Sequence, residues 1–186
     1  MNTKTNVSNT TRRITFCALF AALAIVLTRL LSYAPIPDTR YSLGDIPIFL
    51  AGMFFGPLAG GLVGFGSDLI GAVLFSPHGY NPMLCIPAIL YGVIGGLFCK
   101  ALRKHFSLPL LALAFLIPAA VGSVLIQSAV MAKLFFEGSF MAGYIGYLTA
   151  RGIQYAIVSV VDIALIYLLA RSRIFTKVGI WYPEKG

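Results

Sequence analysis

Two charged residues lie deep within apolar sequence and show where this chain could do chemistry. Asp68 stands in the run LVGFGSDLIG, and Arg151 lies about 12 Å along its expected helix from the nearer end. A charge at such depth costs free energy when it faces lipid, so it should face a polar cavity, a ligand or an opposite charge. Tyr155 and Asp162 share the helix face of Arg151. This arrangement favours a binding site for a small polar molecule.

Each charge also has a structural explanation. Gly60, Gly64 and Gly71 share the helix face of Asp68, so this face could serve close helix packing, with Asp68 in a structural hydrogen bond. Arg151 could pair with Asp68, whereas Asp162 lies three turns farther along the same helix and is too distant to pair with Arg151. Both interpretations stay open at this stage.

Other polar side chains gather in two loops and at helix ends. The loops at 32–42 and 76–82 carry proline, tyrosine and hydrogen-bonding groups, and could close over a cavity. Basic side chains there could bind carboxylates, and tyrosines could stack on a flat ring. The predicted substrate-binding residues are Arg40, Tyr41, Asp68, Tyr80, Asn81, Gln127, Lys133, Arg151 and Tyr155.

The elements that position these residues must be membrane helices. Only 11% of the residues are charged and the mean hydropathy is +0.89, whereas a soluble domain carries roughly 25% charged residues. Counting stretches near the length needed to span a bilayer predicts six helices. They are expected at 14–33, 43–56, 58–75, 83–102, 108–135 and 143–170. We therefore expect an all-α integral membrane protein built as a six-transmembrane-helix bundle.

Basic residues predict the orientation of the bundle. With six spans, all but four of the 14 basic residues fall on one side, which the positive-inside rule makes cytoplasmic, together with both termini. The net charge of +8 is then explained by topology, and no nucleic-acid partner is expected. The exceptions, assigned to the outer half, are Arg29, Arg40, Lys133 and Arg151. Arg29 is expected to snorkel to the outer surface.

The remaining sequence predicts a single membrane domain and no catalysis. We expect a disordered cytoplasmic tail at 1–11, the membrane domain at 12–173 and a second cytoplasmic tail at 174–186. The three cysteines have no metal-ligand spacing, so no metal or cofactor is expected. The chain lacks a phosphate-binding P-loop, an H-E-x-x-H motif and a G-x-S-x-G elbow, which argues against an ATPase and against an enzyme.

A family resemblance is carried by three features of the chain. These are the six helices, the small-residue face of Ala18 and Ala22, and the span from Gly52 to Gly71 followed by the loop SPHGYNP. In these features the sequence resembles the substrate-binding S components of energy-coupling factor (ECF) vitamin transporters, most closely the folate-type branch. The likeness covers nearly the whole chain. Folate-type members tend to carry an aromatic-Pro-Gly-Phe-Thr run where this chain reads YNPMLC.

The resemblance implies a vitamin-capture subunit in a bacterial plasma membrane. Such a subunit binds a vitamin under its outer loops and topples in the membrane to release the vitamin into the cytoplasm. The resemblance to the folate-type branch implies that the vitamin is folate. Its partners would be a transmembrane T component, two ABC ATPase subunits and the bilayer. Ala18 and Ala22 would form the docking face. The residue-level hypothesis agrees, because basic side chains suit the carboxylates of folate and Asp68 could accept hydrogen bonds from its pterin amino groups.

Three alternatives follow from the same residues. The S component could carry another vitamin or metabolite, such as pantothenate, a pyridoxine-like ring or a thiamine precursor. A small intramembrane aspartyl enzyme would need Asp68 and Asp162 to act together. A stand-alone exporter would transport without any ATPase partner.

Overall fold

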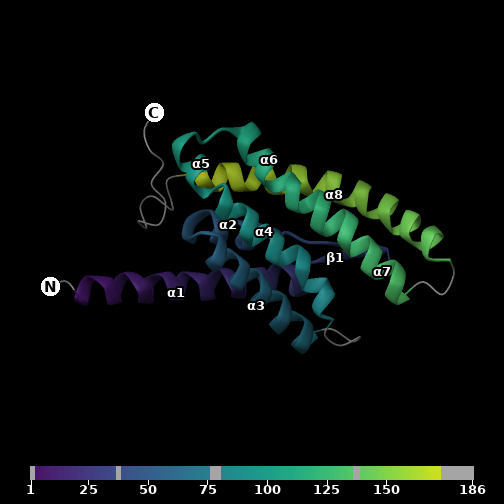
Figure 1. Ribbon diagram of the computed structural model, residues 1–186, viewed down its shortest axis with the longest axis horizontal. Helices are drawn as coiled ribbons and strands as arrows, with labels where there is room; N and C mark the ends of the chain where they lie inside the picture. The colour runs from purple at the N-terminus through teal and green to yellow at the C-terminus, as the bar shows by residue number, and fades with distance from the viewer. Residues whose placement is uncertain (1–2, 37–38, 76–80, 136–138, 173–186) are drawn as a thin grey trace.

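The computed structural model is a helical bundle (Figure 1) and describes residues 3–36, 39–75, 81–135 and 139–172. The chain begins with α1 (Thr3–Ile25), which continues as the π-helical turn η1 (Val26–Leu30). A hairpin of β1 (Tyr33–Ile36) and β2 (Thr39–Tyr41) leads into the short α2 (Asp45–Phe55). The remaining elements are α3 (Pro57–Phe75), η2 (Pro82–Cys85), α4 (Ile86–Leu97), α5 (Cys99–Lys104), α6 (Leu108–Pro118), η3 (Ala119–Ile126), α7 (Gln127–Phe135) and α8 (Phe140–Arg171).

The prediction of a multi-pass helical membrane protein is confirmed in its coarse form. Four helical stretches are long and apolar enough to cross a bilayer: Thr10–Leu30, Pro57–Phe75, Leu108–Leu134 and Phe140–Arg171. The helical segments Asp45–Phe55 and Pro82–Leu97 are apolar but shorter. Six crossings and two cytoplasmic termini therefore stay predictions. The β1–β2 hairpin is antiparallel and was not anticipated from sequence.

The first residues also differ from expectation. The sequence predicted a disordered tail at 1–11, but α1 begins at Thr3. The chain between Thr3 and Ile25 contains no glycine or proline that would end a helix. The helix of the apolar segment therefore continues towards the N-terminus through the polar residues. The expected second tail at 174–186 lies outside the described residues.

Glycines fasten α2, α3 and α4 into one tightly packed unit. A Cβ atom placed on Gly52 or on Gly60 would overlap the backbone at Gly92, and one on Gly64 would overlap the carbonyl of Ala88. The three helices therefore approach one another backbone to backbone, which only glycine allows. Between α2 and α3 the chain turns at Gly56, whose φ of 97° favours glycine. The predicted close-packing role of the glycine face is confirmed.

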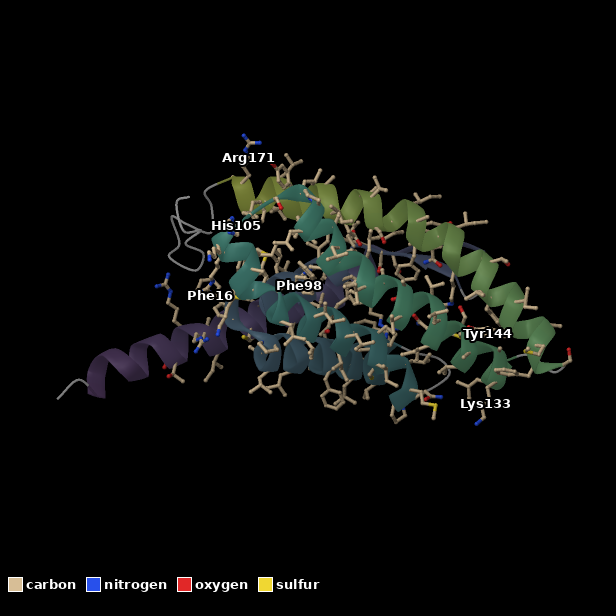
Figure 2. All side chains as sticks on the ribbon, turned by 45° about the horizontal axis from the view of Figure 1, so that its top comes forward. Phe16, Phe98, His105, Lys133, Tyr144 and Arg171 are labelled. Atoms are coloured by element: carbon tan, nitrogen blue, oxygen red, sulfur yellow. The ribbon has the colours of Figure 1, made fainter. Side chains whose placement is uncertain are left out.

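One end of the bundle is rich in basic side chains. Arg13 and Arg103 donate hydrogen bonds to the last carbonyls of α2, at Phe55 and Phe54 respectively. These contacts satisfy carbonyl groups that the end of a helix leaves without intrahelical partners. His105 and Arg171 lie at the same end, whereas Lys133 lies at the other (Figure 2). We call these the basic end and the opposite end.

Candidate ligand-binding site

Polar side chains from four helical segments meet inside the bundle. Tyr91 comes from α4, Ser123 from η3, and Arg151 and Asp162 from α8, and each is no more than 5% exposed. Buried polar groups are costly unless they find hydrogen-bonding or charged partners. Their gathering in an otherwise apolar bundle is typical of a functional site, so we treat it as the candidate. Together with the partly buried Asp45 and Tyr155, these residues form what we call the buried polar cluster.

Asp45 is at the centre of this cluster. It lies in the first turn of α2 and interacts electrostatically with Tyr91, Tyr155 and Asp162. Because α2 is only 11 residues long and ends at the basic end, its first turn lies well inside the bundle. The hairpin that precedes α2 contacts α8 through β2. The short helix and the hairpin thus bring Asp45 into the interior.

Two hydroxyl groups and one cation complete the surroundings of Tyr155. The Tyr155 hydroxyl lies beside Ser123, and Ser123 also lies beside Tyr91. Arg151 interacts electrostatically with Tyr155. Ser123 reaches the interior from η3, a π-helical stretch that follows Pro118. Such π-helical stretches are frequent at functional sites because they redirect side chains. The structure therefore brings the predicted residues Arg151 and Tyr155 into one cluster.

Asp68 forms an ion pair with Arg29, a partner that the sequence did not predict. Its Oδ1 atom accepts a hydrogen bond and ion pair from Arg29 at 3.3 Å, between α3 and η1. Gly71 provides the space, because a Cβ atom there would lie 2.9 Å from Arg29 Nε. The expectation that Arg29 snorkels was wrong, since its side chain is only 13% exposed. The ion pair agrees with the structural interpretation of Asp68.

The other predicted binding residues are more dispersed. Tyr41 at the end of β2 and Gln127 at the start of α7 are partly buried, but Lys133 is exposed and points away from the bundle (Figure 2). Asn81 caps η2, its side chain accepting a hydrogen bond of 3.0 Å from the Met83 backbone N–H. The Arg40 side chain and Tyr80 lie outside the described part of the chain.

The predicted docking residues lie on the surface of the bundle. Ala18 and Ala22 are both exposed on α1, beside the exposed side chains of Leu19 and Leu23. This small-residue face is exposed on the described bundle, as a docking surface requires, but docking itself stays a prediction.

Three members of the cluster, Asp45, Tyr91 and Ser123, were not predicted from the sequence, and Asp162 was left outside the substrate-binding set. Asp45 stands close to the loop at 32–42 in the sequence, and its deep position depends on where the short α2 begins inside the bundle, which the sequence does not show. The helical spacing places Asp162 on the same face as Arg151, and this shared face is the sequence signal that could have included Asp162 in the predicted site. Tyr91 carries no signal in sequence, because an aromatic residue within an apolar helix is ordinary.

Comparison with known proteins agrees with this architecture. A family model described as "ECF-type riboflavin transporter, S component" matches residues 8–171. The folate transporter FolT of Clostridium novyi (strain NT) is 40% identical over 83 residues, which is 45% of this chain and 48% of FolT. The chain thus aligns with about half the length of that curated relative.

A solved structure is similar over a larger share of the chain. The crystal structure of FolT bound with folic acid matches with a TM-score of 0.71 and 25% identity, covering 84% of this chain and 90% of FolT. The predicted resemblance to ECF vitamin-transporter S components is confirmed, and these families are transporter subunits and not enzymes. Because the family model covers most of the sequence, the chain belongs to the ECF-type riboflavin transporter S-component family.

Proposed function

We propose that this protein is the substrate-capture subunit of an ECF-type importer in a bacterial plasma membrane and that its ligand is folate. The observation that carries the proposal is the likeness to FolT bound with folic acid over 84% of the chain. The sequence similarity to a folate transporter adds support for the same ligand.

The buried polar cluster supplies chemistry that suits such a ligand. Arg151, buried in α8, would meet a glutamate carboxylate through charge-assisted hydrogen bonds. Tyr155, which is partly buried, would provide aromatic surface for the flat ring system. Replacing Arg151 with Gln would remove the charge while keeping hydrogen-bonding capacity, and should weaken folic acid binding by about 100-fold. Wild-type affinity in that variant would exclude Arg151 from the site.

A direct test is native mass spectrometry of the detergent-purified protein. A retained folate, displaced one-to-one by added folic acid, is the expected result. If a different vitamin is retained, the family assignment would stand but the proposed ligand would be wrong. Absence of a retained ligand, together with no binding of any vitamin in titrations, would contradict a capture function.

Riboflavin is the second candidate, because the matching family model is described by that vitamin. Its flat isoalloxazine ring would also suit Tyr155, but riboflavin has no carboxylate for Arg151. Substituting Arg151 should therefore affect riboflavin binding less than folic acid binding. Comparing the loss of folic acid affinity with the loss of riboflavin affinity in the Arg151 variant distinguishes the two candidate ligands.

Transport should need partners that this chain does not contain. We propose a T component and two ABC ATPases as these partners, with Ala18 and Ala22 as the docking face. In liposomes the purified chain alone should bind folic acid but not accumulate it, and adding the complete ATPase module with ATP should start uptake. Replacing both alanines with Leu should block uptake while binding persists, because bulky side chains prevent close helix approach. Uptake by the chain alone would favour the exporter hypothesis.

A further inference from the structure

Asp162 is a fully buried acid in the buried polar cluster. It has no exposed surface, and neither of its carboxylate oxygens has a hydrogen-bond partner among the residues that the structure describes. A buried carboxylate in this condition is costly, because the interior cannot replace its hydration. Such a group is retained where it meets a ligand, since intramembrane acids that lack a structural partner mark functional sites. Asp68, by contrast, has its partner in Arg29.

Carboxyl and hydroxyl groups surround Asp162. Asp45, Tyr91 and Tyr155 all interact with it electrostatically. Ser159, one turn earlier on α8, is 2% exposed and its hydroxyl also has no partner among the described residues. This region of the cluster thus suits a ligand group that donates several hydrogen bonds. It does not suit a ligand carboxylate.

Arg151 and Asp162 give the cluster two unlike ends. They lie on one face of α8, about three turns or about 16 Å apart along the helix. An extended molecule with an acidic group at one end and a donor-rich ring at the other spans a similar length. Folate is such a molecule, because its pterin and its glutamate are separated by an aminobenzoyl group.

We propose that Asp162 binds the donor edge of the ligand ring and so selects pterins over flavins. This inference rests on the proposed function of a folate-capture subunit. A pterin presents its 2-amino N–H and its N3–H side by side, which a carboxylate can accept with one oxygen each. The equivalent flavin edge presents one N–H between two carbonyl oxygens. Against a carboxylate, a flavin carbonyl would face another acceptor, and that contact is repulsive.

The test compares two ligands with two proteins by titration calorimetry in detergent. The ligands are folic acid and its 2-desamino-2-methyl analogue, which lacks one of the two donors. Asp162→Asn should weaken folic acid binding by about 100-fold, because it removes the charge and one acceptor. The same substitution should change the affinity for the analogue much less. Retained analogue binding would also show that the variant is folded.

Each alternative result has a distinct meaning. Equal losses for the two ligands would make Asp162 a structural residue and overturn the inference, as would unchanged folic acid affinity. If wild-type protein bound riboflavin and not folic acid, the proposed function itself would fail. The Asn side chain offers one donor and one acceptor, so the ratio of folic acid to riboflavin affinity should also fall in Asp162→Asn. An unchanged ratio would contradict selection by this residue.

Discussion

At the scale of single residues, the charged side chains inside the bundle fall into two groups, those in an ion pair between helices and those in the buried polar cluster. Asp68 and Arg29 neutralise each other between α3 and η1, so they serve the packing of the first helix. Arg151 and Asp162 lie in the buried polar cluster, about three turns apart on α8. The sequence identified Asp68, Arg151 and Asp162 as intramembrane charges but predicted that Arg29 reaches the outer surface. It could not assign partners, because pairing depends on which helices become neighbours.

The Arg29–Asp68 ion pair should behave as a structural unit. Replacing Arg29 with Gln, or Asp68 with Asn, should each lower stability by about 1–3 kcal/mol, because one charge is left without its partner. The double variant should be more stable than the sum of the single losses predicts. Thermal unfolding in detergent measures all three. Strict additivity would contradict a direct interaction.

At the scale of elements, the glycine faces of α2, α3 and α4 decide how the bundle closes. Sequence spacing predicted a close-packed face on α3, and the structure supplies its partner, because Gly60 and Gly64 lie against α4. Spacing could not reveal which helix fills the groove. Nor did it indicate the β1–β2 hairpin, whose Pro35 and short strands resemble an ordinary loop.

A pair of glycine substitutions tests this packing. Gly92→Ala should destabilise the protein by about 1–3 kcal/mol, because its new Cβ would overlap the backbone of Gly60 and neither backbone can move alone. Gly66→Ala is the matched control, since a Cβ there has open space around it. That control should be neutral or slightly stabilising, as alanine favours helix. Equal melting temperatures for both variants would refute close packing at Gly92.

At the scale of the whole molecule, the apolar segments predicted helical membrane architecture because bilayer thickness constrains them directly. The depth of Asp45 was not predictable in the same way. It follows from α2 being 11 residues long and beginning inside the bundle, which is a property of the assembled fold.

The orientation with six crossings can be tested by chemical labelling. Single cysteines would be introduced at Lys104 or Lys133 after replacing the three native cysteines with serine. A membrane-impermeant thiol reagent should label position 133 in intact cells, and position 104 only after permeabilisation. Labelling of both positions from the same side would contradict the predicted topology.

Capture of a folate by the bundle can be tested by competitive titration. Purified protein, stripped of any retained ligand, would be titrated with folic acid and with riboflavin under identical conditions. We expect saturable one-to-one binding of folic acid and at least about 100-fold weaker binding of riboflavin, because riboflavin offers no carboxylate to Arg151. Tight riboflavin binding with no detectable folic acid binding would contradict it.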